Sequence, residues 1–242
     1  SDVCSSDLLM LARVRLAEAS GLQALVLTVD APLSGLRYRQ QQAGFVLPPD
    51  CQPAHPMPQA APRSSDPNAQ IFAGWMAQAP VWDDVYWLCR QTRLPLWLKG
   101  ITHPADAQTA LQCGVAGLIV SNHGGRVLDG TPASLTLLPL IRQALPPQVP
   151  LLLDGGVRRG SDVFRALALG ASAVLLGRPA LYGLATAGAL GVAHVLRLLQ
   201  EELAMTMALC GCATVADIGP EALFSAPAAT GCAPASTQSP AG

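Results

Sequence analysis

The chain alternates between short apolar runs and longer segments in which apolar residues recur at helical spacing. The apolar runs are predicted strands and cover residues 24–30, 95–99, 116–121, 150–154 and 173–176. The predicted helices cover residues 8–20, 82–92, 104–113, 134–144, 162–169 and 191–207, with Ser161 as the cap of the helix that follows it. No hairpin signal joins two of the runs. This alternation predicts an α/β protein with a parallel sheet.

Three segments do not follow the pattern. Residues 1–7 are polar and lack a signal-peptide profile, so we expect them to lie outside the fold. Residues 43–80 are rich in Pro, Gln, Ala and Ser, which predicts a long mobile loop. Residues 219–242 are rich in Ala, Pro, Ser and Thr and are expected to form a disordered tail. The predicted domain is therefore 8–218.

Composition narrows the class of protein. Half of the 242 residues are hydrophobic and the net charge is −1, which argues against a nucleic-acid or polybasic membrane surface. The seven cysteines show no Cys-x-x-Cys spacing and indicate free thiols in a reducing, cytoplasmic compartment. No apolar stretch is expected to approach the roughly 20 residues of a membrane span. No cluster has metal-ligand spacing, so no metal site is predicted.

Polar residues stand at the end of every predicted strand. They are Thr28 with Asp30, Lys99, Ser121 with His123, Asp154, and Gly177 with Arg178. The carboxyl ends of parallel strands meet at one edge, and such a gathering suggests a (β/α)8 barrel. Ser121 and His123 would point the same way if the strand geometry persisted between them. The last two strands end in glycines and arginines suited to a phosphate group.

These motifs resemble one known family. Val120-Ser-Asn-His-Gly-Gly-Arg126, Leu153-Asp-Gly-Gly-Val-Arg-Arg-Gly-Ser-Asp162 and Leu176-Gly-Arg-Pro179 are similar to segments of the FMN-dependent 2-hydroxy-acid oxidases and dehydrogenases. Leu98-Lys-Gly100, Thr28-Val-Asp-Ala-Pro32 and Arg37 fit the same family, so the resemblance covers about residues 21–218. It implies a TIM barrel with FMN that oxidises a small (S)-2-hydroxy acid, of the lactate or glycolate type, to the 2-oxo acid.

The resemblance also implies a role for each residue. His123 would be the catalytic base held by Asp30, while Arg37 and Arg126, with His123, would bind the substrate. The implied cofactor-binding residues are Thr28, Lys99, Ser121, Asp154, Gly155, Gly156, Val157, Arg158, Gly177 and Arg178. Arg159 is an alternative that could share or replace the role of Arg158. His55, His103 and His194 have no motif around them and are interpreted as surface residues.

The family resemblance leaves several properties open. Oxygen, a quinone or a cytochrome could reoxidise the flavin, and a quinone would favour a peripheral location at the inner membrane. Full-length members are expected to be homo-oligomers. Their barrels have eight strands, of which about five have counterparts here, and two substrate-side tyrosines have none. We therefore expect the chain alone to bind FMN weakly and to turn over little substrate.

Two other functions are compatible with the sequence. One is a different flavin-binding or phosphate-binding TIM barrel, such as an isomerase with bound flavin, which would share the glycine and arginine phosphate site. The other is an inactive fragment that binds flavin weakly. Activity on lactate or glycolate distinguishes the first alternative, and a flavin absorbance spectrum distinguishes the second.

Overall fold

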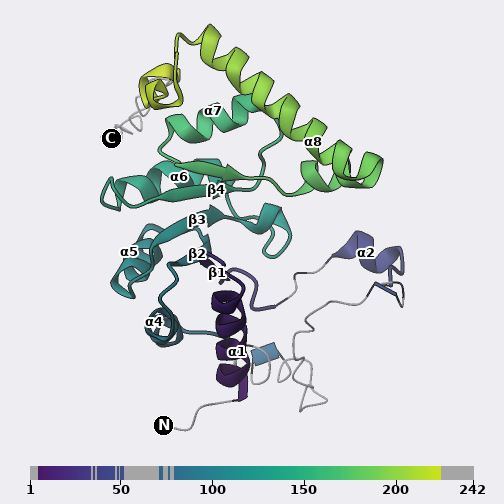
Figure 1. Ribbon diagram of the computed structural model, residues 1–242, viewed down its shortest axis with the longest axis vertical. Coiled ribbons are helices and arrows are strands. Elements are labelled where there is room, and N and C mark those ends of the chain that lie inside the picture. Colours follow the sequence, from purple (N-terminus) through teal and green to yellow (C-terminus); the bar gives the residue numbers. More distant parts are fainter. Residues whose placement is uncertain are drawn as a thin grey trace, which may run out of the picture.

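The fold is a parallel sheet with helices packed on it (Figure 1). The computed structural model describes residues 5–33, 35, 37–46, 48, 50–51, 71–72, 76 and 79–224. The strands are β1 (Leu25–Thr28), β2 (Leu96–Ile101), β3 (Gly117–Ser121), β4 (Leu151–Asp154) and β5 (Ala173–Leu175). They lie in chain order, and every neighbouring pair is parallel. The predicted parallel α/β class is confirmed.

Helices connect and flank the strands. They are α1 (Ser5–Ala19), α2 (Tyr38–Gln42), α4 (Trp82–Gln91), α5 (Pro104–Gln112), α6 (Ser134–Gln143), α7 (Gly160–Ala168) and α8 (Arg178–Leu209). Short 3-10 helices are η3 (His123–Gly125), η4 (Val215–Asp217) and η5 (Pro220–Ala222). Figure 1 shows α1 at the β1 end of the sheet and α8 beyond α7 at the other end.

Along the strands, buried apolar side chains alternate with half-buried polar ones. In β2, Leu96 and Leu98 are buried while Lys99 is half-buried, and in β4 Leu153 is buried while Asp154 is half-buried. Alternate residues of a strand point to opposite faces. The leucines pack with residues of α4, α5 and α6 in one cluster. The opposite face therefore carries the polar residues at the ends of the strands.

The central strand is the most enclosed. All five residues of β3 are buried, whereas β1 alternates between half-buried and exposed positions and β5 has no fully buried residue. A strand that is covered on both faces must be apolar along its length, which explains the run Leu118-Ile-Val120. The exception is the polar residue Ser121, which is fully buried. Its burial is tolerated because its hydroxyl is hydrogen-bonded to Lys99 and Asp154.

Several predicted boundaries differ from the structure. The first helix begins at Ser5, three residues before the predicted start. The prediction that Ser161 caps α7 is wrong, because the helix begins at Gly160 and Asp162 accepts the Arg159 N–H at 3.0 Å. A carboxylate at the third helical position can accept the N–H of the capping residue, and Asp162 does so here. The short helix α2 was not predicted.

The carboxyl-terminal helices also correct the sequence reading. The helix predicted at 191–207 is the second half of α8, which bends at Ala187 and Gly188. The prediction that residues 219–242 form a disordered tail is wrong at η5. Ala222 of this helix and the following Leu223 pack beside Phe164. The rest of that tail, 225–242, and much of the predicted loop at 43–80 lie outside the described residues.

The prediction that no apolar stretch approaches the length of a membrane span is contradicted by one helix. Within the described ranges, α8 alone is long and apolar enough to cross a membrane, with a hydropathy of 1.4 over an 18-residue window that is 6% buried. The stretch between Arg178 and Arg197 contains no Asp, Glu, Lys or Arg, and this long apolar run was not predicted. Length and composition are weak evidence for a span, and the bend at Ala187 and Gly188 interrupts the helix.

Candidate active site

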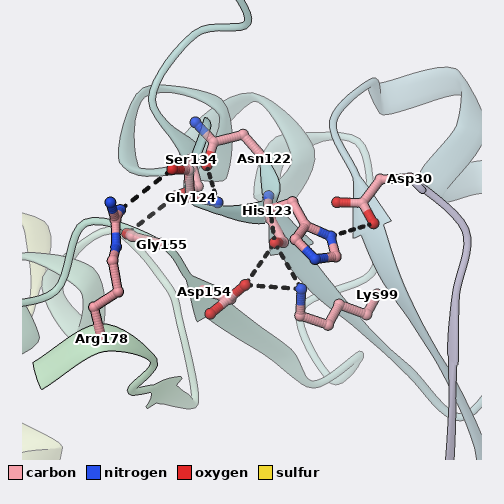
Figure 2. Close-up of polar contacts among 10 residues, drawn as sticks. Asp30, Lys99, Asn122, His123, Gly124, Ser134, Asp154, Gly155 and Arg178 are labelled. Atoms are coloured by element: carbon pink, nitrogen blue, oxygen red, sulfur yellow. Dashed lines mark hydrogen bonds and ion pairs between the residues drawn. The ribbon is translucent and has the colours of Figure 1, made fainter. Parts of the chain in front are cut away.

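Three side chains from neighbouring strands form an ionic cluster on the polar face of the sheet. Lys99 Nζ lies 2.9 Å from Asp154 Oδ2 and donates to Ser121 Oγ at 3.1 Å. The Ser121 hydroxyl donates to the same carboxylate at 2.6 Å. Ser121 and Asp154 are direct neighbours in the β3–β4 register. The strand ends therefore fix an ammonium beside a carboxylate, as Figure 2 shows for Lys99 and Asp154.

The cluster changes the acidity of Asp154. Burial raises the pKa of this carboxyl group, but hydrogen bonds from Ser121 and Lys99 and the Lys99 charge lower it, and the net pKa is below the ordinary aspartate value. The Asp154 and Lys99 side chains are only 16% and 17% exposed, so solvent screens their attraction weakly. Asp154 is therefore ionised at neutral pH and keeps Lys99 in place.

This lowered pKa predicts a pH-dependent loss of stability in Asp154→Asn. The variant keeps the shape of the side chain but loses the charge, and we expect it to unfold about 1.5–3 kcal/mol more easily at pH 7. Because the folded pKa is depressed, the native advantage is complete above the unfolded pKa and disappears as pH falls through the folded pKa.

Denaturant titrations of both proteins at a series of pH values measure this difference. Asp106→Asn, at an exposed position in the first turn of α5, is the control and should stay close to the parent throughout. A difference between parent and Asp154→Asn that stays constant down to strongly acidic pH would contradict the ionic role of Asp154.

His123 lies in a tight turn directly after β3 and faces Asp30. Its Nδ1 is 3.0 Å from Asp30 Oδ1, and the two side chains are 32% and 13% exposed (Figure 2). Gly100 makes this approach possible, because a Cβ there would lie 2.4 Å from the Asp30 Cβ. The contact fixes Nδ1 as the nitrogen facing the carboxylate and leaves Nε2 to exchange a proton with a ligand.

The backbone at His123 differs from the expected continuation of the strand. The residue has a φ of 55°, and its N–H donates to Ser121 Oγ at 3.0 Å. The strand geometry therefore ends at Ser121. The Ser121 hydroxyl supports the Lys99–Asp154 pair and the histidine turn at the same time.

A cavity of about 840 Å³ opens beside these groups. Ten predicted site residues line it: Lys99, His123, Arg126, Asp154, Gly155, Gly156, Val157, Arg158, Gly177 and Arg178. This volume is within the usual range of small-molecule and cofactor sites. Figure 2 shows Arg178 and Gly155 on one side of the site and His123 and Lys99 on the other.

The start of α8 is the better phosphate site of the two helix starts near the cavity. At the start of α7, carboxylates already accept the backbone N–H groups of Arg158 and Arg159 (Asp162, 3.0 Å each) and of Gly160 (Glu202, 2.7 Å). At the start of α8, Gly177 makes no side-chain cap hydrogen bond, and an added Cβ there would meet open space. A helix start without a side-chain cap, beside the Arg178 guanidinium, suits a phosphate.

Four predicted site residues do not line the cavity. Two of them contact residues that do line it, and the other two lie outside it. Asp30 and Ser121 act through contacts to cavity residues. Thr28 is exposed and is paired in register with Lys99 on the same edge of the sheet. Arg37 does not line the cavity, although nearby Gly35 packs against the backbone of Arg126 and Val127. Among the described residues Arg37 Nε is buried without a hydrogen-bond partner.

Sequence reasoning missed several residues near the site. Asn122 and Ser134 hold the loops around the cavity, and Tyr182 of α8 lines it. The signal for Asn122 was its place before His-Gly-Gly, where an amide can cap a turn. A buried serine at the start of a helix gives no comparable signal, nor does an aromatic residue in an apolar helix. No group of three or more His, Cys, Asp or Glu that could hold a metal occurs within the described part of the chain.

A comparison with protein families identifies the class. The model of the FMN-dependent dehydrogenase family matches residues 3–225, which is most of the chain. The chain therefore belongs to this family, and the predicted fold and cofactor are those of the family. The resemblance inferred from the histidine and glycine motifs is confirmed.

Curated relatives and solved structures agree with this assignment. The chain is 54% identical over 208 residues to an L-lactate oxidase of Alicycliphilus denitrificans, covering 85% of this chain and 57% of the relative. It is 45% identical to glycolate oxidase 5 of Oryza sativa subsp. japonica, with coverages of 85% and 57%. A mandelate oxidase variant with (S)-mandelic acid has a TM-score of 0.73 at 38% identity, covering 88% of this chain and 58% of that one. The chain thus spans somewhat more than half the length of these relatives.

The residues present fit the flavin cofactor of the family. A related mandelate oxidase variant with an FMN adduct has a TM-score of 0.71 at 41% identity, covering 86% of this chain and 57% of that one. In this chain, the start of α8 with Arg178 and Arg158 suits the phosphate, and an added Cβ on Gly156 would meet open space. Lys99 and Asp154 offer a donor and an acceptor at the other end of the cavity.

Proposed function

We propose that this chain carries the catalytic residues for FMN-dependent oxidation of a small (S)-2-hydroxy acid to the 2-oxo acid. The observation that carries the proposal is the His123–Asp30 pair at the edge of a cavity that also holds Arg126 and the Lys99–Asp154 pair. Oxidation of a 2-hydroxy acid to the 2-oxo acid removes two protons and two electrons, which requires a base, a group that holds the carboxylate and a cavity for the flavin that accepts the electrons. The names of the relatives, lactate, glycolate and mandelate oxidase, support the substrate class.

His123 is the proposed base. The His123 Nδ1–H donates a hydrogen bond to the Asp30 carboxylate, which orients the ring. The carboxylate also stabilises the positive charge that forms on the ring when Nε2 takes a proton from the substrate. Asp30 Oδ2 has no hydrogen-bond partner among the described residues and is buried, so its carboxylate is available to the imidazolium. The left-handed turn at His123 brings the ring from the strand end to the cavity.

Arg126 and Arg37 are the proposed carboxylate ligands. Arg126 lines the cavity three residues after His123, so a carboxylate bound there places the C2 hydroxyl group near the ring. Arg37 would approach from the segment of Gly35, which lies against the Arg126 backbone. A guanidinium binds a planar carboxylate through two parallel hydrogen bonds, which an ammonium cannot reproduce.

The remaining residues would hold the cofactor. FMN supplies the acceptor for the two electrons when it is bound. Lys99 can stabilise negative charge at the edge of a ring system, and Asp154 can accept from hydroxyl groups. Arg158 and Arg178 would pair with the phosphate. We propose a cytoplasmic location for this chemistry, with the electron acceptor still to be measured.

The test uses the chain preceded by a family-like amino-terminal segment that completes the barrel. This FMN-loaded protein is mixed anaerobically with L-lactate, glycolate or (S)-mandelate. We expect the flavin absorbance near the visible maximum to bleach with at least one of them, and the matching 2-oxo acid to form in equal amount. The (R)-enantiomers of lactate and mandelate are the controls and should leave the spectrum unchanged. Bound FMN that none of the hydroxy acids reduces would favour the alternative of a flavin barrel with another chemistry.

A further inference from the structure

We propose that Asn122 is a positioning residue that holds His123 in its catalytic conformation. This inference rests on the proposed function of His123 as the base. The Asn122 side chain fastens the histidine turn to a neighbouring loop, and Asn122 does not line the cavity. It therefore acts through His123 and not on the substrate.

The turn that carries His123 needs external support. His123, Gly124 and Gly125 have successive φ values of 55°, 65° and 70°. Glycine adopts such angles freely, but a residue with a Cβ does so under strain. A strained backbone of this kind persists only where its surroundings enforce it.

Ser121 and Asn122 provide hydrogen bonds to every N–H of the turn. The His123 N–H donates to Ser121 Oγ at 3.0 Å, and the Gly124 N–H donates to Asn122 Oδ1 at 3.0 Å. The Gly125 N–H donates to the Asn122 carbonyl at 2.9 Å. Without the Asn122 amide, the Gly124 N–H would have no acceptor from this side, and the turn could relax toward ordinary backbone angles.

The other end of the Asn122 amide fixes the turn in space. Its Nδ2 donates to the Pro132 carbonyl at 3.2 Å, which links the turn to the loop before α6. A Cβ on Gly155 would lie 3.0 Å from Asn122 Oδ1 and 3.2 Å from Ser134 Oγ, so the end of β4 closes around the amide. Reversing the amide would place donor against donor and acceptor against acceptor, so only one orientation satisfies both contacts.

The position of the turn decides whether His123 meets Asp30. The ring contact is a single hydrogen bond of 3.0 Å, and it is lost if the backbone rotates by a few tens of degrees. Arg178 also donates to the Gly124 carbonyl at 3.2 Å, but from the far side of the turn (Figure 2). Asn122 is the side chain that connects the turn to its own strand and to the loop before α6 at once.

The test compares Asn122→Ala and Asn122→Asp with Thr131→Val. The aspartate keeps an acceptor for the Gly124 N–H and loses the donor to Pro132. The Thr131 variant loses a hydrogen bond to the Leu128 carbonyl in the same loop, 3.1 Å in the parent, but does not touch the turn. It therefore controls for disturbance of the loop.

The first readout needs neither cofactor nor substrate. Ring ¹⁵N shifts of labelled His123, assigned by comparison with His123→Gln and recorded where the ring is neutral, report the share of each tautomer. We expect the Nδ1–H form to dominate in the parent and in Thr131→Val, a mixture in Asn122→Ala, and partial rescue in Asn122→Asp. A parent-like tautomer in Asn122→Ala would overturn the proposal.

The second readout is turnover of the FMN-loaded protein. Asn122→Ala should lower kcat by roughly 10- to 100-fold, the scale for misplacing a catalytic group by about 1 Å, with little change in KM. An equal loss in Thr131→Val would show a general disturbance and overturn the positioning role. If His123→Gln itself kept full turnover, the proposed base would fail, while the tautomer readout would still decide whether Asn122 places the ring.

Discussion

In a protein whose barrel is completed by a family-like amino-terminal segment, replacing His123 with alanine should lower turnover of a 2-hydroxy acid by about 10²–10⁴-fold. FMN affinity should stay nearly unchanged, because a positioned base contributes to turnover on this scale. The imidazole is the group that Asp30 orients at 3.0 Å, and the ionic cluster of Lys99, Ser121 and Asp154 does not depend on it. The measurement is steady-state turnover of the FMN-loaded variant, with a flavin titration for cofactor affinity.

His194→Ala is the matched control for this substitution. His194 lies on α8 in a second groove, which shares Tyr182 with the cavity. His194 itself does not line the cavity, so its loss should leave turnover within about twofold of the parent. A His123→Ala variant with turnover close to that of the parent would remove His123 from the base role. A variant that also lost FMN would show that the turn supports the cofactor site.

The strand-end residues could be placed from the sequence because the parallel sheet imposes its own geometry. Alternate residues share a face, and equivalent strand ends share an edge. These two rules are enough to bring Lys99, Ser121 and Asp154 together, and the structure joins them by hydrogen bonds. The same rules failed at His123, because the strand ends at Ser121 and the next residue has a positive φ.

Contacts between loops could not be predicted in the same way. Asn122 meets the Pro132 carbonyl and Ser134 meets the Gly155 carbonyl, and both pairs depend on how loops from different units fold over one another. The bend in α8 at Ala187 and Gly188 is a similar case, since Gly183 and Gly191 approach each other across it. Local periodicity carries no information about such close approaches.

Arg37 and Thr28 show the limit of carrying a family role to one residue. Arg37 stays a proposed substrate ligand because its segment packs against Arg126, yet it does not line the cavity. Thr28 stays a proposed flavin contact because it is paired in register with Lys99, yet its side chain is exposed. Both belong to the β1 side of the sheet, and the cavity is lined by residues from Lys99 onward.

Arg178→Ala should weaken FMN binding by about 1.5–3 kcal/mol, or roughly 10- to 100-fold, and weaken riboflavin binding much less. The guanidinium stands in the first turn of α8, where Gly177 makes no side-chain cap hydrogen bond, and it lines the cavity. A phosphate there gains both the helix start and the arginine, whereas riboflavin has no phosphate to offer.

Arg159→Ala is the control for charge, because Arg159 is exposed beside Arg158 but does not line the cavity. Fluorescence titrations of the parent and both variants with FMN and riboflavin give four differences in affinity. If the start of α8 binds the phosphate, only the FMN affinity of Arg178→Ala falls steeply, since removing a cation near the cavity changes long-range attraction by little at physiological salt. Equal losses for FMN and riboflavin would mean that Arg178 supports the loop through its hydrogen bond to the Gly124 carbonyl and does not bind the phosphate.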